Sequence, residues 1–213
     1  MIRGCIFDLD GVVVDTAKYH YLAWNRLARD LGFEFTQEHN ERLKGVSRMA
    51  SLDILLEIGG LTFPLEEKLR LAAIKNDWYV DYISKMTPAE LLPGVPGFLD
   101  LLRKNGIRKA LGTASKNAGM ILSRIGLDKA FDCVIDGNQV THAKPDPEVF
   151  LKAASGLALE PGECVVFEDA IAGIEAAHRG GMKCIGVGKP DILGKADKVI
   201  TGFEGMDIRL LMF

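Results

Sequence analysis

Two pairs of acidic residues each follow a short apolar run, and together they could hold a divalent cation. Asp8 and Asp10 come after the run CIF, and Glu168 and Asp169 come after CVVF. If these runs are β-strands, both pairs lie at carboxyl ends, and the side chains of Asp8 and Asp10 project to the same face. Carboxylates this close repel each other unless a cation or a proton lies between them. Clustered oxygen ligands of this kind suit Mg²⁺.

More ordinary explanations exist for each pair. Solvated surface aspartates are the usual explanation for two aspartates at this spacing. Asp169 could serve only as the cap of a helix that begins at residue 170. The apolar runs that precede the pairs favour a position at the edge of a buried sheet.

Two further segments carry side chains that could bind phosphate. Thr113 and Ser115 follow an apolar run, and Lys116 and Asn117 open the next predicted helix. Hydroxyl groups and backbone N–H groups at a helix N-terminus bind phosphate oxygens, although capping alone would equally explain Ser115. Lys144 stands directly before the helix start PDP. A lone lysine there is usually solvated, so its interest comes from the other strand-end motifs.

Composition fits a globular protein with a sizeable apolar core. The 213 residues carry a net charge of −3 and are 48% hydrophobic, enough for one large domain with or without an insert. The nearly balanced charge gives no sign of a basic surface that would bind nucleic acid or a membrane. No apolar run approaches the roughly 20 residues that span a bilayer. We expect a monomeric, cytoplasmic protein.

The cysteines are expected to be buried apolar side chains. Each of the four, Cys5, Cys133, Cys164 and Cys184, lies inside a short apolar run, and none forms a CxxC pair. Free cysteine often occupies such positions in strands. A zinc site or a disulfide framework is not indicated.

Strand and helix patterns alternate through most of the chain, which predicts an α/β fold. Near-continuous apolar strands separated by helices are typical of a doubly wound parallel sheet, a Rossmann-like core. Strands are expected at 2–9, 109–113, 133–135, 164–167, 184–187 and 198–200. Helices are expected at 97–104, 116–125, 147–154 and 170–178.

One stretch breaks the alternation and predicts a helical cap domain. Residues 16–92 contain no convincing strand, and helices are expected at 17–31, 37–43, 47–58 and 65–86. Turn signals at Thr87-Pro88 and Pro93-Gly94 mark the return to the core, which comprises residues 1–15 and 93–213. The insert leaves the sheet after the carboxyl end of the first strand, where ligands bind in open α/β folds. A lid over the site is therefore expected.

The ordered set of strand-end motifs resembles the haloacid dehalogenase-like hydrolase superfamily. The four motifs are DLDG at 8–11, Thr113, Lys144 and Glu168-Asp169. The resemblance implies a phosphoryl-transfer enzyme in which Asp8 is the covalent nucleophile and Asp10 the general acid and base. It also implies that Thr113 and Lys144 stabilise charge on the transferring phosphoryl group.

The same resemblance implies a magnesium cofactor. Mg²⁺ would be held by the carboxylate of Asp8, the backbone carbonyl of Asp10 and the carboxylate of Asp169. Glu168 would be an additional or outer-shell ligand.

The predicted cap carries a basic turn that could select the substrate. The run KGVSR leads into a helix, and basic residues at a helix N-terminus can bind an anion, although a solvated turn is the more ordinary explanation. In this context the run resembles the cap motif of the superfamily's phosphosugar mutases. There the arginine holds the non-reacting phosphate, and residues of the first cap helix couple lid closure to the acid–base aspartate. The implied substrate-binding and hinge residues are Thr16, His20, Trp24, Lys44, Gly45, Val46, Arg48, Ser115, Lys116 and Asn117.

The resemblance therefore predicts interconversion of β-glucose 1-phosphate and glucose 6-phosphate through an aspartyl phosphate and a bisphosphate. A phosphatase for sugar phosphates or other small phosphomonoesters would share every core motif. A non-catalytic phospho-acceptor module is an alternative from another class. Such a module would be shorter, would lack the insert and would not need Asp10.

Overall fold

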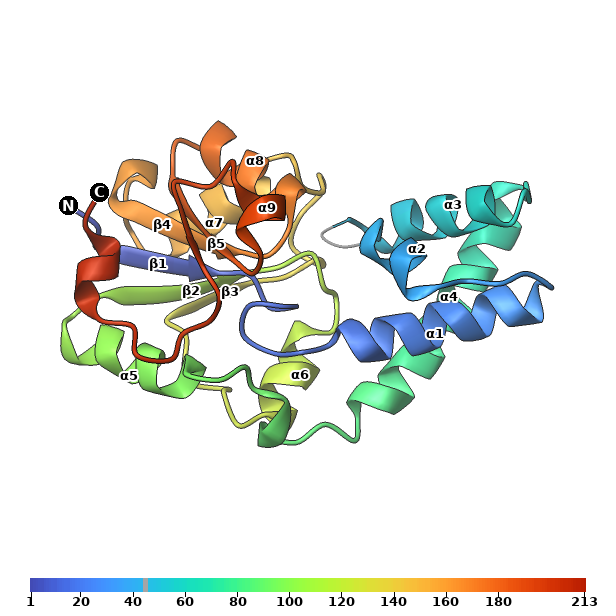
Figure 1. Cartoon of the computed structure of the whole chain (residues 1–213), viewed down its shortest axis with the longest axis horizontal. Helices are drawn as coiled ribbons and strands as arrows, with labels where there is room; N and C mark the ends of the chain where they lie inside the picture. The colour runs from blue at the N-terminus through green and yellow to red at the C-terminus, as the bar shows by residue number, and fades with distance from the viewer. Residues whose placement is uncertain (44–45) are drawn as a thin grey trace.

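The structure, a computed structural model, describes residues 1–43 and 46–213, and in this part of the chain six parallel strands form one sheet (Figure 1). Their order is β3-β2-β1-β4-β5-β6. The strands are β1 (Gly4–Phe7), β2 (Arg108–Gly112), β3 (Cys133–Ile135), β4 (Cys164–Glu168), β5 (Lys183–Val187) and β6 (Lys198–Ile200). The predicted doubly wound parallel sheet is confirmed. Strand β1 is shorter than the expected 2–9, and after Asp8 the chain turns, with the carbonyl of Leu9 accepting the N–H groups of Val13 and Val14.

Helices cover both faces of the sheet, which explains the continuous apolar strands. Cys5 and Phe7 pack in the cluster that contains residues of α5 and α6. Ile6, between them, packs in the cluster on the opposite face, with residues of α7 and α8. Successive strand residues point to opposite faces, so a sheet buried on both sides needs apolar residues at every position. The core helices are α5 (Val95–Lys104), α6 (Ala118–Arg124), α7 (Glu148–Gly156), α8 (Ile171–Arg179) and α9 (Pro190–Leu193).

The segment after β1 forms the predicted helical cap, beside the edge of the sheet toward which the strands point (Figure 1). Trp24, Phe35 and Leu55 belong to a separate buried cluster within the cap, whereas Tyr79 and Ile83 pack with the core of the sheet. An antiparallel bridge between Val14 and Leu91 joins to each other the two segments that connect the core and the cap. The domain boundaries at residues 16 and 92 stay predictions. The cap helices are α1 (Ala17–Asp30), α2 (Gln37–Glu41), α3 (Arg48–Ile58) and α4 (Leu65–Ile83).

Other expectations are confirmed or corrected in detail. Helix α4 ends at Ile83 rather than at residue 86, and a short 3₁₀ turn at Pro88–Glu90 follows it. Helix α9, of four residues, was not predicted because it is too short to show helical periodicity. The cysteines are free, and three of the four are buried. Among the described residues, no helix is long and apolar enough to cross a membrane.

Candidate active site

The two acidic pairs meet at the carboxyl ends of β1 and β4. These strands are neighbours in register, with Phe7 opposite Phe167, so Asp8 and Glu168 are the next residues along. The backbone N–H of Asp8 donates to the carbonyl of Phe167 at 3.0 Å, which continues the ladder beyond the strand. The chain leaves β1 toward β2 and leaves β4 toward β5, on opposite sides. This is the switch point at which open α/β sheets bind ligands.

The carboxylates here fit a divalent cation. Asp8, Glu168 and Asp169 each offer an oxygen, and these oxygens lie within 4.8 Å of one another. Hard oxygen donors of this kind are the ligands that Mg²⁺ prefers. When bound, Mg²⁺ would offset negative charge on phosphoryl oxygens. The side chain of Asp10 is not part of this group, and a role for its backbone carbonyl stays a prediction.

Lys144 lies between two of these carboxylates. Its Nζ donates to Asp8 Oδ1 at 2.5 Å and to Glu168 Oε2 at 2.8 Å, and all three side chains are buried. Burial alone would lower the pKa of Lys144, but the two carboxylates outweigh burial and raise it. The ammonium group therefore stays charged. A fixed positive charge beside Asp8 reduces the repulsion between this carboxylate and an anionic substrate.

Glu168 is fully buried and held on both oxygens. Its Oε1 accepts the backbone N–H groups of Asp169 and Ala170, each at 3.1 Å, while Oε2 faces Lys144. Burial raises the pKa of Glu168 to about 7, and Lys144 opposes this rise. Helix α8 comes so close that a Cβ atom on Gly173 would overlap the Glu168 carboxylate.

The substitution Gly173→Ala is therefore expected to displace Glu168 and to disturb its partner Lys144. We expect the free energy of unfolding to fall by about 2 kcal/mol because the added methyl overpacks the site. We also expect weaker Mg²⁺ binding, measured by calorimetry. Gly119→Ala in α6 is the matched control, since a Cβ there would meet no described atom within 4 Å. It should leave Mg²⁺ binding unchanged and raise stability slightly, because alanine has the higher helix propensity. Equal effects of the two substitutions would contradict the proposed contact.

Asp10 is held by the first residue of the cap segment. The buried hydroxyl of Thr16 donates a hydrogen bond to Asp10 Oδ1. Burial and the nearby charge of Asp8 raise the pKa of Asp10 from 3.8 to about 6. Near neutral pH this carboxyl can take up or release a proton with little driving force either way, as general acid–base chemistry requires. The contact also links its position to the cap hinge.

The cap contains a buried lysine, Lys75 of α4, that the sequence analysis missed. Lys75 Nζ lies 3.2 Å from His20 Nδ1 and over the rings of Trp24, at 4.4 Å, and Tyr79, at 4.7 Å. Burial lowers the pKa of Lys75 to about 7 and lowers that of His20 well below its usual value. A neutral imidazole can accept a hydrogen bond from the ammonium. Trp24 is buried beneath Lys75, and its role toward a substrate stays a prediction.

A sequence signal for Lys75 was present. Lys75 falls between Leu71 and Tyr79 on the i, i+4 stripe that α4 buries, and Ile83 continues the same stripe. A charged residue on a buried stripe needs a partner or a function. Neither motif spacing nor composition identified it.

The basic turn of the cap is described in part. Helix α3 begins at Arg48, and the hydroxyl of Ser47 caps it by accepting the N–H of Ala50 at 3.3 Å. The charge of Arg48 depresses the pKa values of His20 and Lys75, so these three groups share one region of the cap. Val46 is partly buried. Lys44 and Gly45 lie outside the described residues, and their roles stay predictions.

The predicted phosphate-binding segment forms a turn at the end of β2. Thr113 is buried and its Oγ1 accepts the N–H of Ser115 at 3.1 Å, while Ser115 Oγ accepts the N–H of Asn117 at 3.3 Å. Helix α6 begins one residue after Asn117, so Lys116 precedes the helix instead of opening it. Asn117 Nδ2 donates to Asn76 Oδ1 on α4 at 3.2 Å, which connects the core to the cap.

The fold and the site together define an α/β protein with an acidic, lysine-containing site beneath a helical cap. The chain belongs to the haloacid dehalogenase-like hydrolase family, whose model matches residues 2–181. The motifs at β1, β2 and β4 and the cap insert fall within this match.

Relatives share both the core and the cap. The chain is 40% identical to the β-phosphoglucomutase of Bacillus subtilis over 212 residues, which cover 99% of this chain and 94% of that protein. It is 35% identical over 189 residues to a phosphorylated carbohydrates phosphatase of Thermotoga maritima, covering 86% of this chain and 84% of that protein. A crystal structure of β-phosphoglucomutase from Clostridium difficile is similar, with a TM-score of 0.94 and 42% identity over 99% of this chain and 95% of that one.

Proposed function

We propose that this protein is a magnesium-dependent β-phosphoglucomutase, which acts as a cytoplasmic monomer on β-glucose 1-phosphate and glucose 6-phosphate. The observation that carries this proposal is the 40% identity to the Bacillus subtilis β-phosphoglucomutase across 99% of the chain. This identity and coverage are higher than those for the Thermotoga maritima phosphatase, which is 35% identical across 86% of the chain. The contact between Thr16 and Asp10, which links the cap to the acid–base group, also supports the proposal.

In the proposed reaction, a carboxylate oxygen of Asp8 attacks phosphorus and the bond to the leaving sugar oxygen breaks. Asp10 protonates that leaving oxygen, and in the reverse direction it removes the proton from the attacking hydroxyl. Lys144 and Thr113 offset charge on the phosphoryl oxygens. This transfer gives an aspartyl phosphate and a sugar hydroxyl.

The mutase cycle starts from phosphorylated Asp8. The phosphoryl group passes to the free sugar hydroxyl and gives a bisphosphate, which reorients and returns its other phosphoryl group to Asp8. Arg48 would hold whichever phosphate is not reacting. A closed cap would exclude water, which would otherwise hydrolyse the aspartyl phosphate.

A primed assay tests the proposal. Enzyme and Mg²⁺ are mixed with β-glucose 1-phosphate and a trace of glucose 1,6-bisphosphate, and both glucose 6-phosphate and inorganic phosphate are measured. We expect glucose 6-phosphate in large excess over inorganic phosphate, and little product from the α-anomer. Stoichiometric release of inorganic phosphate would favour a phosphatase, like the Thermotoga maritima relative, and would overturn the mutase proposal.

The substitution Arg48→Ala is expected to lower kcat/KM of the mutase reaction by roughly 10 to 100-fold. The reason is the loss of a charge-assisted contact to the non-reacting phosphate. Phosphorylation of Asp8 by acetyl phosphate, which has no second phosphate, should change by less than about 3-fold. Arg42→Ala is the control, because Arg42 is an exposed cap arginine paired with Glu57. If Arg48→Ala lowers the rates of the mutase reaction and of phosphorylation by acetyl phosphate to a similar extent, Arg48 supports the fold and does not bind the second phosphate.

A further inference from the structure

The segment that carries Lys144 has no regular structure of its own. Residues 136–147, all of which the structure describes, form neither helix nor strand and connect β3 to α7. Thr141, His142 and Ala143 are exposed, whereas Lys144 is buried. A lysine side chain has four rotatable bonds, so its ammonium is well placed only where the backbone beneath it is fixed. Something outside the segment must therefore hold it.

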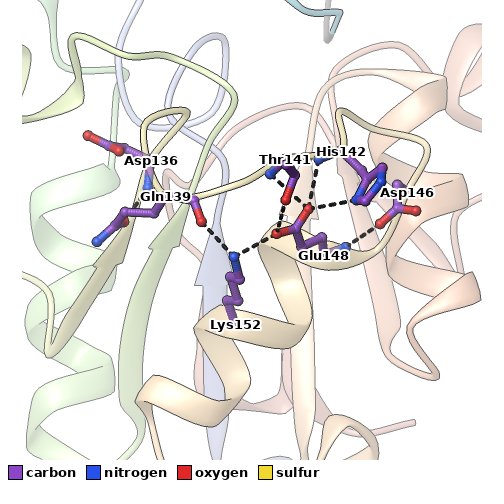
Figure 2. A network of polar contacts seen from close by, with 7 residues as sticks. All are labelled: Asp136, Gln139, Thr141, His142, Asp146, Glu148 and Lys152. Atoms are coloured by element: carbon purple, nitrogen blue, oxygen red, sulfur yellow. Dashed lines mark hydrogen bonds and ion pairs between the residues drawn. The ribbon is translucent and has the colours of Figure 1, made fainter.

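Glu148 is the first residue of α7, and its carboxylate binds the backbone of the segment just before Lys144 (Figure 2). Its Oε2 accepts the backbone N–H groups of Thr141 at 2.9 Å and of His142 at 2.7 Å. The hydroxyl of Thr141 donates to Oε1 at 3.2 Å, and His142 Nδ1 lies 3.1 Å from Oε2. Two adjacent backbone groups are thus tied to one side chain.

A lysine one turn further along α7 extends the same network. Lys152 Nζ lies 2.6 Å from Glu148 Oε1 and also 2.6 Å from the carbonyl oxygen of Gln139 (Figure 2). The side chain of Gln139 in turn accepts the N–H of Asp136 at 2.8 Å. The segment is therefore attached to the helix at several points before it reaches Lys144.

Helix α7 is a rigid support for these contacts. Val149 and Phe150 are buried in the core cluster that also contains Ile6 of β1. The ring of Phe150 also lies beneath Lys144, with Nζ 4.7 Å from its centroid. Glu148 holds the backbone that precedes Lys144, and Phe150 contacts the Lys144 ammonium. One helix therefore positions both the backbone and the side chain of this lysine.

The hydrogen bonds of Glu148 favour a role in holding the segment over a role in binding a cation. His142, Asp146 and Glu148 have ligand atoms within 4.8 Å of one another, the spacing of a possible metal site. The oxygens of Glu148 already accept hydrogen bonds from two backbone N–H groups, a hydroxyl and an ammonium. Its carboxylate is thus fully engaged in holding the segment.

We propose that Glu148 is a positioning residue for phosphoryl transfer, which holds the 136–144 segment so that Lys144 meets Asp8 and Glu168. This inference rests on the proposed function, because it assigns Glu148 a role in the phosphorylation of Asp8. Displacement of a charged group by about 1 Å can cost roughly 100-fold in rate. A carboxylate that never touches the substrate can therefore control kcat.

The first test uses Glu148→Gln, which keeps the shape of the side chain but replaces one acceptor oxygen with a donor. We expect the single-turnover rate of Asp8 phosphorylation by acetyl phosphate, followed by intact-protein mass spectrometry, to fall about 10-fold or more. The KM for the sugar phosphate should change by less than about 3-fold, because Glu148 does not touch the cap. Thermal unfolding checks that the variant folds.

Asp197→Asn is a closely matched control. Asp197 also accepts a backbone N–H, from Cys184 at 2.9 Å, and contacts a lysine, Lys183, at 2.6 Å, together with His178 at 3.0 Å. Its side chain is 20% exposed, against 16% for Glu148. It lies near the start of β5, at the opposite end of that strand from the active site. It should lose similar stability and keep the wild-type rate.

A double-variant comparison separates positioning from general support. If Glu148 acts only through Lys144, adding Glu148→Gln to Lys144→Ala should lower the rate by less than about 2-fold beyond Lys144→Ala alone. Independent, multiplying losses would overturn the proposal. So would a wild-type rate for Glu148→Gln, or an equal loss for Asp197→Asn. If the wild-type protein is itself not phosphorylated at Asp8, the proposed function fails first.

Discussion

Replacement of Asp8 by asparagine is expected to abolish turnover, lowering kcat by at least about 10⁴-fold. The amide cannot form the aspartyl phosphate, and nearby carboxylates cannot replace it, because Lys144 and backbone N–H groups hold Glu168 in place. The variant should remain folded. Its amide oxygen can still accept from Lys144, which also keeps its pairing with Glu168.

Two measurements check this expectation. The primed mutase assay should give no product above background, and mass spectrometry should find no phosphorylated protein after incubation with acetyl phosphate. Asp191→Asn is the control, since Asp191 is an exposed aspartate in α9. Substantial turnover by Asp8→Asn, with thermal unfolding like that of wild type, would rule out a covalent mechanism at this residue.

Replacement of Asp10 by asparagine is expected to lower activity by about 10³-fold, because general acid–base groups contribute roughly 10² to 10⁴-fold. The same substitution should make the Mg²⁺-free protein more stable at neutral and alkaline pH. Asparagine can accept the hydrogen bond from Thr16 without placing a second negative charge near Asp8. Loss of activity together with a gain in stability is typical of a residue retained for function.

The pH dependence follows from the pKa of Asp10, which folding raises from 3.8 to about 6, chiefly through burial and secondly through Asp8. Between these pH values the folded wild-type chain binds more protons than the unfolded chain, so its stability falls as the pH rises. Above about pH 6 Asp10 is ionised in the folded chain, and the free energy of unfolding is lowered by the full cost of this buried charge. At pH 8 we therefore expect the free energy of unfolding of Asp10→Asn to exceed that of wild type by roughly 3 kcal/mol, and below pH 3.8 we expect no difference from this source.

Urea unfolding in EDTA at several pH values tests the stability prediction, with the mutase assay alongside. Thr16→Val is a useful companion, because it removes the hydrogen bond to Asp10 but leaves the carboxylate. It should lower activity less than Asp10→Asn does. A stability difference that is independent of pH would mean that the Asp10 carboxyl does not carry the shifted pKa. Full activity of Asp10→Asn would mean that Asp10 is not the general acid and base.

Much of the fold follows from local patterns that need no knowledge of the partners. The apolar runs before Asp8 and Glu168 predicted strands buried on both faces, and the alternation with helices predicted a parallel sheet. Carboxyl ends of parallel strands share one edge, so the positions of the acidic pairs after two apolar runs were enough to predict that Asp8 and Glu168 lie close together. The missing strands between residues 16 and 92 were enough to predict the helical cap.

The contacts within the site join residues that are far apart in the sequence, so only the tertiary structure determines these contacts. The sequence marks Lys144 as a basic residue near a helix, but its position between Asp8 and Glu168 depends on partners 136 and 24 residues away. The apolar stripe of α4 marks Lys75 as a buried position, but its contact with His20 exists only because α4 packs against α1. Glu148 has no motif of its own, because its role comes from the path of an irregular segment. Periodicity and motif order determine which residues share an edge, whereas side-chain packing determines which of them touch and therefore where charge is held.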